Sequence, residues 1–206
     1  MFDFSDRVVL VTGVTGNLGG AVANAFRAAG AHLVLVDRAP DRLPDLYPDL
    51  VGSPDHYLAT GVDLNNSEAV SEMVEETLAR LGRIDVLANT VGGYRAGSPV
   101  HETSLDTWEF MLKLNARTAF IASRAVVPAM LDQGAGKIVH TGSGSALEGG
   151  RNAAAYSASK CAVVRLVESL AAELKGKGIN ANCVLPGTID TPENREDMPK
   201  ADHSKW

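Results

Sequence analysis

The sequence has little of what nucleic-acid-binding, disulfide-bonded and membrane-spanning proteins need. Its 19 lysines and arginines are outnumbered by 25 aspartates and glutamates, so the net charge of -6 offers no basic field to a phosphate backbone. The two cysteines, Cys161 and Cys183, lie in apolar stretches without a partner at metal-ligand spacing, and we expect both to be small buried side chains. No apolar run approaches the roughly 20 residues that cross a bilayer, and residues 1–7 lack the apolar core of a signal peptide. We therefore expect a cytoplasmic protein that binds no nucleic acid, membrane or metal.

The sequence does contain the apolar content of one folded domain and a regular alternation of strand and helix signals. Of its 206 residues, 45% are hydrophobic, which is enough to build a core. Short runs rich in β-branched residues predict strands at 7–12, 31–37, 56–60, 84–88, 137–140 and 179–185. Apolar periodicity and alanine-rich stretches predict helices at 21–29, 67–81, 105–131 and 154–174. This order predicts an α/β fold with a doubly wound, mainly parallel sheet and helices on both faces.

The helix at 67–81 has the most complete local signals. Ser67 is the predicted N-cap and Gly82 the predicted stop. The apolar face is predicted to consist of Val70, Met73, Val74 and Leu78. The stretch that follows the second strand is rich in proline and aspartate and is predicted to be a loop.

A glycine-rich turn follows the first strand. Gly13, Gly16 and Gly19 would permit a tight turn and a close approach of the backbone to a pyrophosphate at a helix N-terminus. Glycines before a helix are often plain turn residues, but the flanking strand and helix favour a nucleotide-binding turn. Asp37, about 20 residues further on, could accept hydrogen bonds from the ribose of NAD(H), or it could simply start a loop. NADP(H) stays open because the adjacent Arg38 could neutralise a 2′-phosphate.

Tyr156 and Lys160 lie four residues apart and therefore on one face of a predicted helix. A free tyrosine has a pKa near ~10 and acts as a base at neutral pH only when a nearby cation stabilises the phenolate. Such a pair could also lie on an ordinary exposed helix face. The polar, glycine-rich stretch at the end of the fifth strand argues for a site, because Ser143 or Ser145 could donate a hydrogen bond to a substrate oxygen.

Read in order, these motifs resemble the short-chain dehydrogenase/reductase family across essentially the whole chain. The turn at Thr12-Gly13 is similar to the family's cofactor loop, and Ser143 precedes Tyr156 by the family's usual thirteen residues. The other segments that resemble family motifs are Asp63-Leu64, Asn89 to Gly92, Asn115, and Pro186 to Thr191. The resemblance implies a sheet of order 3-2-1-4-5-6.

The resemblance also implies residue roles. Tyr156 would be the general acid/base, Lys160 would lower its pKa and hold the ribose, and Ser143 would orient the reacting oxygen. Asn115 would anchor a water relay. The implied cofactor-binding residues are Gly13, Gly16, Asn17, Leu18, Gly19, Asp37, Asp63, Leu64, Asn89, Gly92, Tyr156, Lys160, Pro186, Gly187, Ile189 and Thr191.

The sequence departs from the family pattern in three places. Many members place the second glycine of the turn one residue later, and Thr90 and Val91 replace the family's Asn and Ala. The chain stops at Trp206, before the family's seventh strand, so we expect a C-terminally incomplete domain with strand 179–185 at an unpaired edge.

The predicted substrate side contains Tyr94, Arg95, Ser145, Leu147 and the segment after Thr191. Arg95 could pair with a carboxylate or be solvated. His101 and His140 are interpreted as ordinary surface and strand-end residues.

The family commonly assembles through the long helices, so a homodimer or homotetramer is expected. An apolar stripe on the helix at 154–174 could contribute to that contact or could pack against the sheet, and it consists of Val163, Val164, Val167 and Leu170.

The expected function is therefore hydride transfer between NAD(H) and a small alcohol or ketone. Two alternatives stay open: a catalytically idle dinucleotide-binding sensor or scaffold, and a nonredox lyase or epimerase on the same fold.

Overall fold

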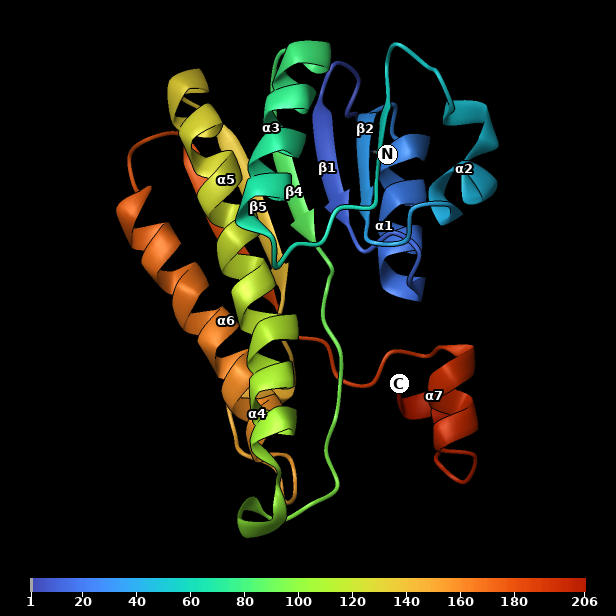
Figure 1. The fold of residues 1–206 in the computed structure, drawn as a ribbon, viewed down its shortest axis with the longest axis vertical. Coiled ribbons are helices and arrows are strands. Elements are labelled where there is room, and N and C mark those ends of the chain that lie inside the picture. The colour runs from blue at the N-terminus through green and yellow to red at the C-terminus, as the bar shows by residue number, and fades with distance from the viewer. Residues whose placement is uncertain (1) are drawn as a thin grey trace.

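The computed structural model describes residues 2–206, which form a six-stranded parallel sheet covered by helices on both faces (Figure 1). The strand order β3-β2-β1-β4-β5-β6 confirms the predicted doubly wound sheet. The strands are β1 (Val8–Thr12), β2 (His32–Asp37), β3 (Tyr57–Thr60), β4 (Val86–Asn89), β5 (Gly136–Thr141) and β6 (Ile179–Val184). The helices are α1 (Asn17–Ala28), α2 (Arg42–Leu46), α3 (Ser67–Leu81), α4 (Leu105–Met111), α5 (Thr118–Gln133), α6 (Ala154–Glu173) and α7 (Pro192–Asp197).

The sheet is buried on both faces because successive side chains of each strand point to opposite sides. In β1, Val9 and Val11 pack in the core beneath α1 and α2, whereas Val8 and Leu10 pack in the core beneath α3, α5 and α6. Each such side chain contributes roughly 1.5–3 kcal/mol when it is fully buried. The two cores hold the carboxyl ends of the strands in register.

The apolar stripe of α6 belongs to the monomer itself. Val167 and Leu170 lie in the core beneath α3, α5 and α6, and Val163 and Val164 are also buried. Packing within the chain is therefore confirmed as the role of this stripe, and these four side chains are not available to a partner subunit.

Helix α3 confirms its predicted bounds but not its predicted cap. Asn66, not Ser67, is the N-cap: its Oδ1 accepts hydrogen bonds from the backbone N–H groups of Glu68 (3.0 Å) and Ala69 (3.3 Å). Ser67 already belongs to the helix. Gly82 ends the helix in the left-handed conformation (φ 75°), as predicted.

The long helix predicted at 105–131 forms, from Leu105 to Gln133, but it is not α-helical throughout. Between α4 and α5 the chain forms a π-helical turn, Leu112–Arg117, in which each backbone hydrogen bond spans one more residue than in an α-helix. Asn115 lies in this turn with 1% of its surface exposed. The extra residue changes the direction in which Asn115 points relative to a continuous α-helix.

Two short helices lie where no helix is predicted. The loop after β2 contains α2 and a single 3₁₀ turn, Pro48–Leu50, and it buries Leu43, Tyr47 and Leu50. Helix α7 is capped by Thr191, whose Oγ1 accepts a hydrogen bond from the N–H of Asn194. Helices this short do not complete two turns of apolar periodicity, so the pattern could not reveal them.

Cys161 and Cys183 are only half-buried, so the prediction that both are buried side chains is wrong. Cys183 lies in β6, the edge strand, where one face of the sheet is less covered. Burial raises the pKa of its thiol, and the N–H of Gly142 and the charge of Lys160 act in the opposite direction.

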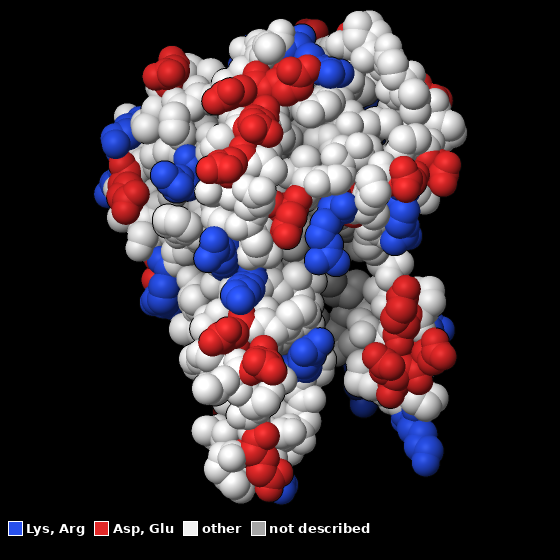
Figure 2. Space-filling view, in the orientation of Figure 1, with Lys and Arg blue, Asp and Glu red and all other residues white. Residues whose placement is uncertain are grey.

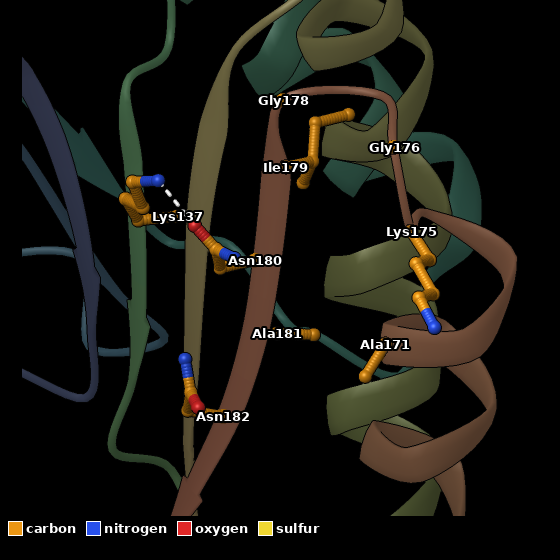
Figure 3. Close-up of a pocket in the computed structure, with 9 residues that line it drawn as sticks. All are labelled: Lys137, Ala171, Lys175, Gly176, Gly178, Ile179, Asn180, Ala181 and Asn182. Carbon is orange, nitrogen blue, oxygen red and sulfur yellow. Dashed lines mark hydrogen bonds between the residues drawn. The ribbon is translucent and has the colours of Figure 1, made fainter.

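Strand β6 forms one edge of the sheet, as the sequence predicts. Figure 3 shows Ile179 and Ala181 directed toward α6, while Lys137 of β5 bonds Asn180 beside them. A hollow of about 540 Å³ lies between this edge and the end of α6. Among the helices of residues 2–206, none combines the length and the hydropathy of a membrane span.

Asp85 ties the amino-terminal ends of β1 and β4 together. Its carboxylate accepts hydrogen bonds from Arg83 (2.7 and 2.8 Å), Arg7 (3.2 Å) and the N–H of Val8 (2.9 Å), and the residue is 8% exposed. Burial alone would raise the pKa of Asp85, but these donors together lower it. The charge is therefore retained in the folded state because it is well bonded.

We expect Asp85→Asn to lower the free energy of unfolding by about 2 kcal/mol, because two arginines lose their charged partner at a buried position. Urea unfolding at neutral pH measures the change. The control is Glu76→Gln, which removes an exposed ion pair with Arg80 and should cost less than about 0.5 kcal/mol. Equal effects of the two substitutions would contradict the structural role of Asp85.

Candidate active site

Two adjoining cavities lie at the carboxyl ends of the strands. One, of about 540 Å³, is lined by the glycine turn, Asp37 and Asp63. The other, of about 620 Å³, is lined by Ser143, Tyr156 and Lys160 and by the segment that leads into α7. Leu18, Thr90 and Gly92 line both cavities, so the two form one trough. Figure 2 shows the surface hollowed between the body of the molecule and α7.

We call the cavity at the glycine turn the nucleotide end and the cavity at Tyr156 the substrate end. The trough brings together most of the predicted site residues from seven segments of the chain. Those at the nucleotide end are Gly13, Gly16, Asn17, Leu18, Gly19, Asp37, Asp63, Leu64 and Gly92. Those at the substrate end are Ser143, Tyr156, Lys160, Pro186, Gly187, Ile189 and Thr191. Asn89 and Asn115 lie behind the wall, 3% and 1% exposed, and do not line it.

The glycine turn is shaped by two close approaches. Gly13 has a φ of +70°, and a Cβ at Gly19 would lie 2.2 Å from the carbonyl oxygen of Gly13. A side chain at Gly19 would therefore force the turn apart. Gly16 has more room, because the nearest atom to its ideal Cβ is 3.4 Å away.

Two of the three departures from the family pattern, the glycine spacing and the pair Thr90 and Val91, lie against each other. Thr90 Oγ1 donates a 2.6 Å hydrogen bond to the carbonyl of Thr12, and it would lie 2.8 Å from a Cβ on Gly19. Val91 Cγ2 would lie 2.9 Å from a Cβ on Gly13. The side chains of Thr90 and Val91 thus form the wall on which this glycine turn rests.

Helix α1 points its N-terminus into the nucleotide end. Its N-cap is Gly16, and within the described chain no side chain caps the first turn and no acidic residue lies in it. Backbone N–H groups there, with the positive end of the helix dipole, suit an anion. Asn17, the first residue of α1, donates a 2.6 Å hydrogen bond to Glu193 of α7, so α7 is tied to the turn.

Asp37 is fixed by its neighbours. Its Oδ2 accepts hydrogen bonds from the N–H (3.2 Å) and Oγ1 (2.8 Å) of Thr15, and its Oδ1 accepts one from the N–H of Ala39 (3.0 Å). The carboxylate is 9% exposed and lines the nucleotide end. It is therefore held at the end of β2, where the sequence predicts an acceptor for ribose hydroxyls.

Lys160 is a buried cation at the substrate end. Its Nζ donates a 2.9 Å hydrogen bond to the carbonyl of Thr141, and the residue is 5% exposed. Burial lowers its pKa to about 8. Gly92 makes room for this arrangement, because a Cβ there would lie 2.9 Å from Lys160 Nζ and 2.8 Å from Asn115 Oδ1.

Tyr156 lies one helical turn before Lys160 on α6 and contacts the ring of Tyr94 edge to face, with ring centroids 4.7 Å apart. Ser143, at the end of β5, is 9% exposed, and its Oγ accepts a 3.2 Å hydrogen bond from the N–H of Ser145. The side chains of Tyr94, Ser143, Tyr156 and Lys160 all line the substrate end. The predicted acid/base, cation and hydroxyl donor are thus gathered in one cavity.

Asn115 braces the substrate end from behind. Its Oδ1 accepts a hydrogen bond from the N–H of Gly93 (2.9 Å), and its Nδ2 donates to the carbonyl of Gly93 (3.1 Å) and to Ser159 Oγ (2.9 Å). Ser159 Oγ in turn donates to the carbonyl of Tyr156 (2.7 Å). The π-helical turn therefore links the loop after β4 to the first turns of α6, while the water relay stays a prediction.

His140 is the main site-proximal residue that the sequence interpretation missed. It is fully buried: its Nδ1 lies 3.0 Å from Asn89 Nδ2, and its Nε2 lies 2.7 Å from Ser123 Oγ. Asn89 Oδ1 accepts a 2.7 Å hydrogen bond from Thr12 Oγ1. These contacts join β1, β4, β5 and α5 directly beneath the trough, and an isolated histidine at a strand end gives no signal of such partners.

We expect His140 to make the protein sensitive to acid. Burial, with the charge of Lys160, lowers its pKa from 6.5 to about 4. The unfolded chain therefore binds a proton between these values that the folded chain does not, and stability is lost as the pH falls from 6.5 to 4. The loss amounts to about 3 kcal/mol at most.

Chemical unfolding at pH values on either side of this window tests the prediction. His140→Asn should show a smaller loss of stability on acidification than the unmodified protein, whereas the exposed-residue control His101→Asn should show the same loss. An unchanged pH dependence in His140→Asn would contradict the assignment.

Arg95 and Leu147 lie outside the trough. The guanidinium of Arg95 stacks over the ring of Phe110 at 4.0 Å, and Leu147 is 70% exposed. His101 is exposed beside Glu102. Within residues 2–206, no group of three His, Cys, Asp or Glu side chains is arranged to hold a metal ion.

Comparison with known proteins identifies the family. The model of the short chain dehydrogenase family matches residues 7–202. The chain is 35% identical over 189 residues to the 2-dehydro-3-deoxy-L-rhamnonate dehydrogenase (NAD(+)) of Sphingomonas sp. (strain SKA58), covering 92% of this chain and 74% of the relative. It is 36% identical over 188 residues to the meso-2,3-butanediol dehydrogenase of Serratia marcescens, covering 91% of this chain and 73% of the relative.

A solved structure supports the same family assignment. The crystal structure of gox2181 superposes with a TM-score of 0.89 at 32% sequence identity, covering 99% of this chain and 80% of that one. A family model that spans nearly the whole chain, relatives above 30% identity and a shared sheet order lead to one conclusion. The chain belongs to the short-chain dehydrogenase family of oxidoreductases.

Proposed function

We propose that this chain is an NAD(H)-dependent oxidoreductase that interconverts small alcohols and ketones. The observation that carries the proposal is the single trough with Ser143, Tyr156 and Lys160 at one end and the glycine turn with Asp37 at the other. A dinucleotide needs such an elongated site, and the acid/base group must lie at the end that holds the nicotinamide.

The residues present fit a dinucleotide. The absence of a Cβ at Gly13 and Gly19 lets the turn close tightly, and the uncapped N-terminus of α1 suits a pyrophosphate. Asp37 would accept the ribose hydroxyls, Asp63 and Leu64 would contact the adenine, and the segment from Pro186 to Thr191 would hold the nicotinamide. When bound, the nicotinamide ring supplies the acceptor or donor of the hydride.

The chain's own residues would handle the proton and the reacting oxygen. Tyr156 Oη takes the hydroxyl proton of an alcohol or returns it to a ketone oxygen. Lys160, whose ammonium form predominates below pH about 8, stabilises negative charge on that phenol oxygen. Ser143 donates a hydrogen bond to the same substrate oxygen, and Asn115 holds the loop at Gly93 against α6.

Asp37 is expected to set the cofactor preference. Its carboxylate would bond a ribose diol but repel a 2′-phosphate, so NADH should bind more tightly than NADPH. Asp37→Ala should weaken NADH binding about tenfold and narrow the difference between the two cofactors, because one to two hydrogen bonds to a charged acceptor are lost. Fluorescence titration with NADH and NADPH measures both effects.

The matched control is Asp41→Ala, which removes an exposed carboxylate in the same loop. It should leave both affinities unchanged. Tighter binding of NADPH to the unmodified protein would contradict the role of Asp37.

We also propose that the protein is cytoplasmic and forms a homodimer or homotetramer through its long helices. Phe120 of α5 and Trp108 of α4 are 51% and 40% exposed and offer apolar surface on that side of the molecule. Light scattering measures the oligomeric state, and a monomer at micromolar concentration would contradict this proposal.

A further inference from the structure

The substrate end is lined almost entirely by neutral groups. Within residues 2–206, Lys160 is the one side chain with a formal charge among those that line it. Leu18, Ile189 and Met198 supply apolar surface. The neutral polar side chains are those of Thr90, Tyr94, Thr141, Ser143, Ser145, Tyr156, Thr188, Thr191 and Asn194.

Three charged residues in the segments that border this cavity are engaged elsewhere. The Arg95 guanidinium lies over Phe110. Arg195 binds Asp190 through two hydrogen bonds of 2.5 and 2.7 Å. The carboxylate of Glu193 accepts the hydrogen bond from Asn17 at the other end of the trough. Each of these groups would have to leave its partner to meet a charged substrate.

A charged substrate would therefore be poorly compensated. A carboxylate that enters the cavity gives up its hydration, and Lys160, the cation that lines the cavity, already donates to the carbonyl of Thr141. Pairing Lys160 with a carboxylate would also draw its charge away from Tyr156. An ammonium group would meet no carboxylate among the described lining residues.

The cavity has more hydroxyl groups than the reacting oxygen needs. Ser143 and Tyr156 serve that oxygen under the proposed function, and the segment from Pro186 to Thr191 serves the nicotinamide, which leaves Tyr94 and Ser145 as further hydroxyl-bearing side chains in the same cavity. Ser145 is held next to Ser143 through its backbone N–H, and Tyr94 contacts the ring of Tyr156. Because both residues contact a residue that serves the reacting oxygen, their hydroxyl groups are the ones available to a second oxygen of the substrate.

We propose that the substrate is an uncharged compound with a second hydroxyl or carbonyl oxygen on the carbon next to the reacting one. This inference rests on the proposed function and specifies its substrate class. Neutral vicinal diols and hydroxyketones satisfy the lining, whereas hydroxy acids and amino alcohols do not.

A matched series of small alcohols tests the proposal with the full chain and NAD⁺. Propane-1,2-diol, lactate, 1-aminopropan-2-ol and butan-2-ol share the same reacting carbon and differ in one substituent. The kcat/KM of the diol should exceed that of lactate and of the amino alcohol by roughly 30-fold or more, because each of these buries an unpaired charge. The kcat/KM of the diol should also exceed the kcat/KM of butan-2-ol about fivefold, because the diol makes one more hydrogen bond.

The same comparison on a cyclohexane ring covers larger substrates: trans-cyclohexane-1,2-diol against 2-hydroxycyclohexanecarboxylate. A hydroxy acid used as well as the matching diol would overturn the substrate class while supporting the proposed function. Turnover of none of these compounds would also overturn the class, and the proposed function would then be judged separately by hydride transfer from a wider panel of alcohols.

A positive charge introduced into the cavity provides a second test of the substrate class. Met198 lines the substrate end at the end of α7 and is 39% exposed. Met198→Arg should raise the ratio of kcat/KM for lactate to that for the diol about tenfold, because the carboxylate gains a partner. Met198→Gln, similar in length but neutral, should leave the ratio unchanged. An unaltered ratio in a folded Met198→Arg protein would overturn the proposal.

Discussion

Replacing Tyr156 with phenylalanine is expected to reduce kcat for alcohol oxidation about a thousandfold, the range expected when a general acid/base is removed. The substitution deletes one oxygen from a side chain that lines the substrate end and keeps the ring that packs against Tyr94. The hydroxyl proton of the substrate then has no acceptor on the chain. Turnover is followed through the nicotinamide absorbance.

Two controls separate the loss of chemistry from the loss of structure. NADH should bind Tyr156→Phe with nearly the affinity of the unmodified protein, because the glycine turn and Asp37 are untouched. Tyr94→Phe removes a phenol oxygen from the neighbouring ring and should keep kcat within about tenfold, since it affects at most one substrate hydrogen bond. Most of the activity surviving in Tyr156→Phe would rule out its assignment.

Lys160→Met is expected to have opposite effects on activity and stability. Without the cation, the phenol oxygen of Tyr156 is no longer stabilised as an anion, and kcat should fall by about a hundredfold or more. Burial lowers the pKa of Lys160 from 10.5 to about 8, so the folded chain loses this proton before the unfolded chain does. The buried charge therefore destabilises the fold below pH 8, and stability rises between pH 8 and 10.5.

At neutral pH, Lys160→Met removes that penalty, which is about 3 kcal/mol at most, and loses the hydrogen bond to Thr141, which offsets part of the gain. We expect a Tm higher by a few degrees, measured by circular dichroism. Lys137→Met, which removes a lysine bonded to Asn180 at the open edge of the sheet, should change neither activity nor Tm. A Lys160→Met protein that is both active and less stable would contradict the account of Lys160.

The parts of the fold predicted from sequence are those that depend on local pattern. Runs such as Val8 to Val11 are short, apolar and β-branched, and they fall in the buried strands of the sheet. Gly13 and Gly19 stand where side chains would collide, so their positions carry information about the turn. Tyr156 and Lys160 share one helix, and their spacing is preserved in the structure because α6 is regular there.

The parts that could not be predicted depend on partners distant in sequence or on choices between similar residues. Asn66 and Ser67 are both good N-caps, and only the backbone conformation at Asn66 decides between them. The π-helical turn at Asn115 is stabilised by bonds to Gly93 and Ser159, which are 22 and 44 residues away. His140 is buried through contacts with Asn89 and Ser123 on other elements.

Alcohols that carry deuterium on the reacting carbon provide the most direct test of the central claim. The protein is incubated with NAD⁺ and the deuterated propane-1,2-diol or cyclohexane-1,2-diol, and the reduced cofactor is analysed by mass spectrometry. The account predicts deuterium on the nicotinamide with the unmodified protein and about a thousandfold less in the same time with Tyr156→Phe. Tight NADH binding without deuterium transfer from these or from a wider panel of alcohols would contradict it and would indicate a dinucleotide-binding protein that does not catalyse hydride transfer.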